Sequence, residues 1–278
     1  MSFINYNGSV VSPQTGLVTA ASRGFRYGDG LFETMKMLNG KIIHEGKHFE
    51  RLWHGMNVLQ FEPGKHFTKQ LLTDALKSLA EKNGHEKAAR IRLNIFRGEG
   101  GLYDAENHSP NYIIETWPLQ IADGLNSNGL VLGIYEAVQK SCDVISNLKH
   151  NNYLPYVMAA LHAKKEKWND SVLLNQYGRI ADSTISNIFL IKNEIVYTPA
   201  LTEGCVAGIM RKALIEYLKK NNWQVNETVL NTEDVLNADE VFLTNSISCI
   251  RWVQNIGDKK YSNTLTQKIY SVFYPTIC

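Results

Sequence analysis

A glycine-bearing segment that runs into a helix is the first candidate for chemistry in this sequence. Residues 203–210 read Glu-Gly-Cys-Val-Ala-Gly-Ile-Met, and an apolar spacing typical of a helix begins at about Ile209. Glycine lets a backbone approach a ligand closely, and the first turn of a helix presents N–H groups and a positive dipole end to an anion. A phosphate site is one interpretation. The other is a plain loop that leads into a helix, and this segment alone favours the loop.

Arginines alternate with apolar residues over residues 89–97. Ile91 and Leu93 share one face of the expected strand, whereas Arg90 and Arg92 share the other. A planar guanidinium can bind a carboxylate through two parallel hydrogen bonds, so these side chains are candidates for holding an acidic substrate. The solvated face of a strand explains them equally well.

The composition excludes several classes of partner. The chain has 278 residues and is 44% hydrophobic, and its 29 basic and 27 acidic side chains give a net charge of +2. The densest basic group, Lys164, Lys165 and Lys167, is typical of a solvated helix face, so we expect no nucleic-acid partner. No apolar run is long enough to cross a bilayer and the amino terminus lacks the layout of a signal peptide, so we expect no membrane association.

The cysteines indicate neither a metal site nor a disulfide scaffold. Cys142, Cys205, Cys249 and Cys278 lack metal-ligand spacing and are too few to staple a fold. A reducing, cytoplasmic setting is the default expectation for such a chain.

The first part of the chain has the pattern of a mixed α/β unit. Alternating apolar residues and Asn-Gly turns indicate strands, and apolar stripes with a spacing of three and four indicate helices. Strands are predicted at residues 3–11 (a pair), 30–37, 41–44, 89–97 and 111–116, and helices at 48–60 and 68–83.

A second unit is expected after a polar segment with two glycines. This length suits two domains, and we place them at residues 1–118 and 130–278 with a linker at 119–129. In the second domain, strands are predicted at residues 130–137, 171–175, 187–191, 194–197 and 240–244, and helices at 153–168, 209–221 and 231–238.

Six segments, in order, resemble motifs of the class-IV aminotransferases and aminodeoxychorismate lyases, which use pyridoxal 5'-phosphate. Each match alone is weak, but together they extend from Arg23 to about Val253. They are Arg23-Gly-Phe-Arg-Tyr-Gly-Asp-Gly-Leu-Phe-Glu33, His48-Phe-Glu-Arg-Leu52, Lys149-His-Asn-Asn-Tyr153, Gly178-Arg-Ile-Ala-Asp-Ser-Thr-Ile-Ser-Asn-Ile-Phe189, Gly208-Ile-Met-Arg211 and Leu243-Thr-Asn-Ser-Ile-Ser-Cys-Ile-Arg251.

The resemblance implies a fold and an assembly. It predicts the two-domain α/β (α+β) architecture of fold type IV, with the cofactor at the domain interface, and a homodimer whose subunits share active-site walls.

The resemblance also assigns the two residues closest to the reaction. Lys149 would carry the cofactor as a Schiff base and then move the α-proton as general acid and base, which requires a desolvated amine. Asp182 stands where the family has Glu, facing the pyridine nitrogen, where a carboxylate keeps the ring protonated as an electron sink. Because aspartate is one methylene shorter, either the backbone moves closer or a water intervenes. The alternative for Asp182 is a turn or N-cap residue.

The resemblance also implies which residues bind the cofactor phosphate. Arg51 would contribute the charge, and the helix start at Gly208, Ile209 and Met210 would contribute N–H groups. Ser246 would add a hydroxyl. Met210 stands where many relatives have Thr, so a hydroxyl is lost there.

Substrate-binding residues are matched more loosely. Tyr27 and Phe32 match positions that line the pocket, and Arg92 matches a substrate-facing arginine of branched-chain aminotransferases. Arg26 and Arg179 are further candidates for binding a carboxylate.

Two enzyme functions compete, and a binding protein is the third possibility. Tyr27 and Glu33 favour an aminotransferase that uses a branched-chain or D-amino acid and a 2-oxo acid, and we place this reaction first. Lys149-His150, Gly208-Ile-Met-Arg211 and the loop at Arg97-Gly-Glu-Gly-Gly101 favour aminodeoxychorismate lyase, which releases pyruvate and 4-aminobenzoate. A non-catalytic homologue would not need both Lys149 and Asp182.

Overall fold

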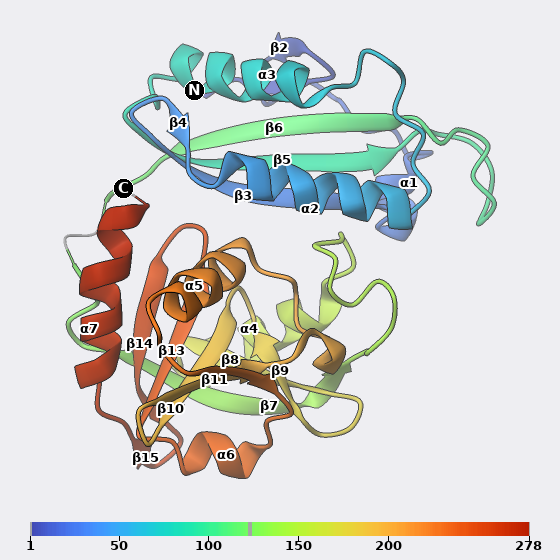
Figure 1. Cartoon of the computed structure of the whole chain (residues 1–278). Coiled ribbons are helices and arrows are strands. Elements are labelled where there is room, and N and C mark those ends of the chain that lie inside the picture. Colours follow the sequence, from blue (N-terminus) through green and yellow to red (C-terminus); the bar gives the residue numbers. More distant parts are fainter. Residues whose placement is uncertain (1, 122–123, 278) are drawn as a thin grey trace. The chain divides into compact units, whose positions relative to one another are not determined.

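The computed structural model describes residues 2–121 and 124–277, which form two compact units (Figure 1). The first unit contains Met1–Ile121 and Leu148–Asn152, and the second contains Ala122–Asn147 and Tyr153–Cys278. The expected linker at residues 119–129 includes residues 122 and 123, which lie outside the described part of the chain.

The first unit is built on an antiparallel sheet of six strands in the order β2-β1-β6-β5-β3-β4. Strand β5 has the predicted period of two, because Ile91 and Leu93 are fully buried whereas Arg90 is exposed. The strands are β1 (Ile4–Tyr6), β2 (Ser9–Val11), β3 (Gly30–Leu38), β4 (Lys41–Ile42), β5 (Ala88–Arg97) and β6 (Pro110–Pro118).

Two long helices lie along this sheet (Figure 1). Helix α2 (Glu45–Val58) buries Phe49 and Leu52. Helix α3 (Lys69–Lys82) is N-capped by Thr68, whose side chain accepts a hydrogen bond from the Leu71 amide. The short helix α1 (Arg23–Tyr27) was not expected from the sequence.

A segment from the middle of the chain extends the first unit. The amide of Phe32 donates to the carbonyl of Lys149 (2.8 Å), and the amide of Asn151 donates to the carbonyl of Gly30 (2.9 Å), so this segment lies against the start of β3. A Cβ at Gly30 would come within 2.2 Å of the Ile95 carbonyl oxygen, which explains the glycine.

The second unit contains a nine-stranded sheet in the order β12-β11-β10-β13-β14-β7-β8-β9, with β15 paired to β14. Strand β9, at one end of this order, also contacts β10 and β11, so the sheet curls around a core. The strands are β7 (Leu130–Lys140), β8 (Asp170–Asn175), β9 (Ile180–Ser183), β10 (Asn187–Lys192), β11 (Ile195–Pro199), β12 (Val225–Thr228), β13 (Glu240–Asn245), β14 (Cys249–Ile256) and β15 (Lys259–Lys260).

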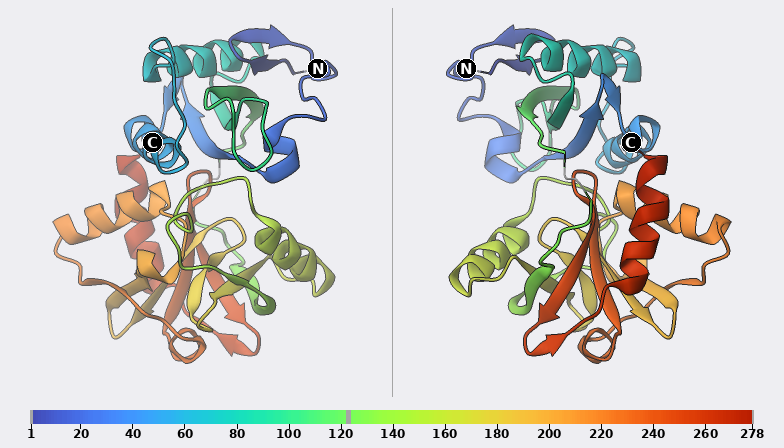
Figure 2. Two further views of the ribbon diagram at one scale, coloured as in Figure 1. Left: turned by 90° about the vertical axis from the view of Figure 1, so that its right-hand side faces the viewer. Right: turned by 90° about the vertical axis from the view of Figure 1, so that its left-hand side faces the viewer.

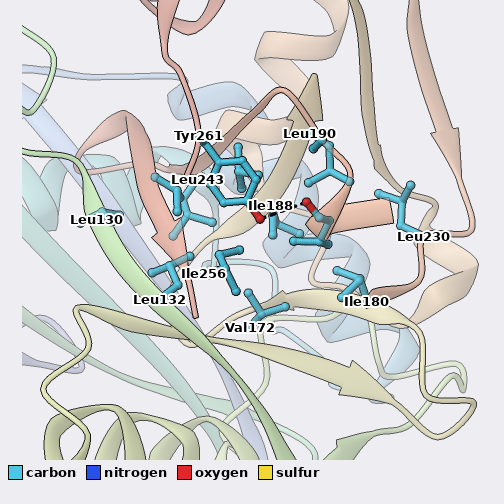
Figure 3. Packing of buried hydrophobic residues seen from close by; sticks show 14 of the residues in the cluster. Leu130, Leu132, Val172, Ile180, Ile188, Leu190, Leu230, Leu243, Ile256 and Tyr261 are labelled. Atoms are coloured by element: carbon cyan, nitrogen blue, oxygen red, sulfur yellow. Dashed lines mark hydrogen bonds between the residues drawn. The ribbon is translucent and has the colours of Figure 1, made fainter. Parts of the chain in front are cut away.

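Apolar side chains from different strands point toward one another inside this curled sheet (Figure 3). Leu132, Val172 and Ile188 are fully buried there. Tyr261 closes the cluster, and its hydroxyl donates to the Val235 carbonyl (3.0 Å). This core holds the strand ends that carry the candidate site residues of the second unit.

Helices complete the second unit, and α7 lies along β13 (Figure 2). They are α4 (Leu154–Lys165), α5 (Ile209–Lys220), α6 (Thr232–Leu236) and α7 (Thr264–Phe273), with 3₁₀ turns at Leu201–Glu203 and Tyr274–Thr276. The expected strands and helices of both units are present, with ends shifted by a few residues, whereas β9, β12, β14, β15 and α7 were not expected. In the described part of the chain, no helix has the length and apolar character needed to span a bilayer.

Candidate active site

Lys149 lies beside an aromatic ring at the edge of the first sheet. Its backbone is held by Phe32, as described above, and its Nζ lies 4.5 Å from the centroid of the Phe32 ring. The side chain of Phe32 is almost fully buried and Lys149 is half-buried. The amine is therefore placed against an apolar surface by a backbone hydrogen bond.

Arg92 contacts the same ring. Its guanidinium carbon lies 4.2 Å from the Phe32 centroid. The register of β3 and β5 pairs Phe32 with Asn94 and Thr34 with Arg92, so these side chains share one face of the sheet. The structure therefore brings Lys149, Phe32 and Arg92 together.

The opposite face of β3 carries a buried ionic cluster. Glu33 accepts hydrogen bonds from Arg51 Nε (2.8 Å) and Arg51 Nη2 (2.5 Å), and its Oε2 lies 2.6 Å from His48 Nδ1. Burial raises the pKa of Glu33, but the charge and hydrogen bonds of Arg51 and His48 outweigh it and set the pKa at about 2. Glu33 is thus an anion near neutral pH, and it holds Arg51.

The other substrate candidates, Tyr27, Arg26 and Arg179, each have contacts of their own. Tyr27 packs against Tyr103, with ring centroids 5.6 Å apart. Arg26 is exposed and its Nε donates to the Ala20 carbonyl (2.6 Å). In the second unit, Arg179 lies 3.5 Å from a Glu203 carboxylate oxygen. Their substrate roles stay predictions.

Asp182 is the centre of a buried polar cluster in the second unit. Its Oδ2 accepts hydrogen bonds from Lys140 Nζ, the Tyr156 hydroxyl and the Val206 amide, each at 3.0 Å. Its Oδ1 is buried and has no hydrogen-bond partner among the described residues. One carboxylate oxygen is therefore saturated and the other is available to a donor.

Tyr156 remains a donor in this cluster. Burial, followed by the negative charge of Asp182, raises the pKa of the Tyr156 phenol well above its usual value of 10. The hydroxyl therefore keeps its proton and donates it to Asp182.

Lys140 and Tyr156 were not identified from the sequence. Lys140 ends a strand whose residues 136–139 are exposed or half-buried, so its burial could not be read from its neighbours. The Tyr156 hydroxyl comes from the first turn of α4, three residues after the Lys149 motif ends. This closeness to the Lys149 motif was the one feature of the sequence that could have identified Tyr156 as a candidate.

The start of α5 is the candidate phosphate site. Gly208 is its N-cap and supplies no side-chain cap, while Ile209 and Met210 form the first turn. Asn187 packs against the segment that leads into α5. Its Nδ2 donates to the Val206 carbonyl (2.8 Å), and its Oδ1 would lie only 1.9 Å from a Cβ at position 208. Glycine is required there by close packing.

A buried hydroxyl lies next to Asn187. Thr244 of β13 pairs with Asn187 of β10, so their side chains are neighbours on one face. Thr244 Oγ1 is buried and makes no hydrogen bond within the described chain. Ser246 follows in the turn after β13, where Asn245 Oδ1 accepts the amides of Ile247 and Ser248. Among the described residues, no cluster of His, Cys, Asp or Glu could hold a metal.

The known proteins that this chain resembles point to one family and one fold. The family model described as Amino-transferase class IV matches residues 30–256. An aminodeoxychorismate lyase of Vibrio harveyi is 30% identical over 88% of this chain and 89% of its own length, and a branched-chain-amino-acid aminotransferase of Escherichia coli K12 is 25% identical over 98% and 92%. The crystal structure of the branched-chain aminotransferase of Thermoproteus uzoniensis with norvaline has the same fold, with a TM-score of 0.88 at 22% identity over 99% of this chain and 94% of that one.

Proposed function

The chain belongs to the class IV aminotransferase family, and from this premise we propose that it is a pyridoxal-phosphate-dependent aminotransferase. Its substrates would be an amino acid, of the branched-chain or D-amino-acid type, and a 2-oxo acid. Relatives that bear the aminotransferase name cover nearly the whole chain.

The single observation that carries the cofactor proposal is the buried Oδ1 of Asp182, which has no hydrogen-bond partner among the described residues. A protonated pyridine nitrogen is a cationic N–H donor, and a buried carboxylate oxygen without a partner is its complement. The three donors on Oδ2 fix the carboxylate plane and leave Oδ1 for this contact. The chain's own residues therefore fit the cofactor's ring nitrogen, even though Asp182 is shorter than the usual Glu.

The phosphate of the cofactor would be bound by one charged side chain and by several hydrogen-bond donors. Arg51 would bind the phosphate with its guanidinium, and Gly208, Ile209 and Met210 would donate backbone N–H groups. Ser246 would contribute a hydroxyl. The buried Thr244 hydroxyl would replace the one that Met210 lacks. These are the residues of each unit that suit a phosphate.

Pyridoxal phosphate supplies the electron sink for the reaction, and the chain supplies positioning and proton transfer. Lys149 would hold the cofactor covalently and, once released by the substrate, carry a proton on Nζ beside the Phe32 ring. Asp182 would stabilise the proton on the ring nitrogen. Arg92 would bind the substrate carboxylate on the same face as Lys149.

We also propose that the chain forms a homodimer through helix α4. Leu154, Val157, Met158 and Leu161 are 75%, 44%, 44% and 58% exposed and recur at the spacing of one helical face. An apolar stripe of this kind is typical of an interface with a second copy of the same chain.

Aminodeoxychorismate lyase is the second candidate function. It is favoured by the 30% identity to the Vibrio harveyi lyase over most of both chains. The lyase would use Lys149 and Asp182 in the same places but would need no amino acceptor.

One experiment distinguishes the two reactions. The purified protein is mixed with single L- and D-amino acids without oxo acid, and the cofactor absorbance is followed. An aminotransferase keeps the amino group on the cofactor, so its colour bleaches and returns with 2-oxoglutarate or pyruvate. If no amino acid bleaches it and aminodeoxychorismate yields pyruvate without an acceptor, the lyase is correct. Borohydride reduction must label Lys149 in either case.

A further inference from the structure

Strand β3 contacts both residues of the first unit that we propose to bind the cofactor, Lys149 and Arg51. Its alternation places Phe32 and Glu33 on opposite faces. Phe32 holds Lys149 through the 2.8 Å backbone hydrogen bond, and Glu33 holds Arg51 through two hydrogen bonds. Adjacent residues of one strand therefore fix the lysine segment and the phosphate-binding arginine.

Glu33 limits the orientation of the Arg51 guanidinium. A long arginine side chain has many rotamers, and ordering it has an entropic cost. A carboxylate that accepts from both Nε and Nη2 fixes the plane of the guanidinium and the direction of Nη1. The side chains of Glu33 and Arg51 are 1% and 10% exposed, so water cannot easily replace this contact.

His48 in turn fixes Glu33. It lies three residues before Arg51 on α2, on the same side of the helix, and its Nδ1 contacts Glu33 Oε2. Both side chains are 1% exposed. The carboxylate is thus held between two residues of one helix, and its low pKa keeps it charged at every working pH.

From this geometry we infer that Glu33 is a positioning residue that orients Arg51 toward the cofactor phosphate, so that Glu33 sets the preference of the protein for a phosphorylated over an unphosphorylated pyridoxal. The inference rests on the proposed function, because it requires that Arg51 bind the phosphate. It assigns Glu33 no contact with the reacting atoms.

The test compares two ligands on the full-length protein after removal of bound cofactor. Dissociation constants for pyridoxal 5'-phosphate and for pyridoxal are measured by absorbance titration in the wild type, Glu33→Gln and Arg51→Ala. We expect Glu33→Gln to lower the preference for the phosphorylated ligand roughly tenfold. Its affinity for pyridoxal should change little. In an Arg51→Ala background, Glu33→Gln should have no further effect on the preference.

Glu240→Gln is the matched control. Glu240 is an equally buried carboxylate, and it accepts the Leu265 and Thr266 amides at the start of α7. Its loss should lower thermal stability without changing the ligand preference.

The outcomes separate the inference from the proposed function. A wild type that binds both ligands equally, with no labelling of Lys149, refutes the proposed function. A wild type with a clear preference that Glu33→Gln retains refutes only the role of Glu33, as does an equal loss of affinity for both ligands. If Glu33→Gln does not fold, Glu33→Asp replaces it, because the shorter acid keeps the charge but cannot reach both nitrogens; an unchanged preference in that variant overturns the inference.

Discussion

Lys140 Nζ lies 3.0 Å from Asp182 Oδ2, and the two side chains are 7% and 3% exposed. Removing one partner from a buried ion pair leaves the other charge desolvated and uncompensated, which is far more costly than the pair's own net contribution. Lys140 is therefore the cationic partner of the acidic side chain that the second unit buries at Asp182.

Lys140→Met should lower the free energy of unfolding by about 3 kcal/mol. Denaturant unfolding of the cofactor-free protein measures this. The control is Lys219→Met, because Lys219 also lies 3.0 Å from a carboxylate, that of Glu227, but is 52% exposed and should lose less than about 1 kcal/mol. Equal losses in both variants would mean that the Asp182 cluster is solvated.

Asp182→Asn should fold and bind cofactor but lose roughly a hundredfold in turnover. The amide oxygen can accept the donors of Lys140 and Tyr156, but its NH₂ group then faces the cofactor nitrogen and cannot keep it protonated. Turnover and the absorbance of the bound cofactor check this. Normal turnover would make Asp182 a structural residue only.

Asp182→Glu is the conservative partner of that variant. It restores the residue typical of the family and keeps the charge, so turnover should fall far less than in the Asn variant. The position is only 2% exposed, so the added methylene should reduce stability by about 1–3 kcal/mol.

The low pKa of Glu33 predicts that part of the free energy of unfolding is lost in acid. Its folded pKa of about 2 lies below the usual value of 4.5, so its stabilisation is complete above pH 4.5 and is lost as the pH falls toward 2. The full contribution is about 3 kcal/mol. The stability gap between the wild type and Glu33→Gln, measured by thermal unfolding, should therefore shrink between pH 4.5 and 2. A gap that stays constant with pH would contradict the ionised state.

Local patterns predicted part of this structure well. The face of β5 that carries Arg92 follows from its period-two alternation, because one side of the strand packs against helices. Helix α7 also had a legible pattern, since Leu265, Ile269 and Phe273 recur every four residues, and it was overlooked.

Long-range contacts could not be predicted in this way. The Lys149 segment clusters with the first unit because its backbone pairs with Gly30 and Phe32, which lie far earlier in the chain. The spacing of apolar and polar residues around Lys149 gives no indication of that pairing. Likewise, a single lysine at a strand end is normally solvated, and only the curled sheet buries Lys140 against Asp182.

Leu161→Glu should convert the proposed dimer to a monomer. A buried glutamate without a partner would cost several kcal/mol at an apolar interface, which is enough to dissociate it at micromolar concentration. Light scattering after size-exclusion chromatography measures the mass. Leu71→Glu is the control, since Leu71 is a 41% exposed leucine of α3 outside the proposed interface. A monomeric wild type, or a dimeric Leu161→Glu, would exclude this interface.

Arg92→Met should raise KM for the amino substrate about ten- to hundredfold, because a charge-assisted contact with a carboxylate contributes about 1.5–3 kcal/mol. The guanidinium lies 4.2 Å from the Phe32 ring that also borders Lys149, so its loss removes a cation beside the amine that we propose to react. Cofactor affinity should be unchanged, because Arg92 is not among the proposed phosphate contacts. Arg90→Met is the matched control: Arg90 lies on the same face of β5 but contacts Trp117, 5.5 Å away. Its KM should equal that of the wild type. If both variants behave alike, the arginines of β5 are the solvated face of a strand, and the substrate carboxylate must be bound elsewhere.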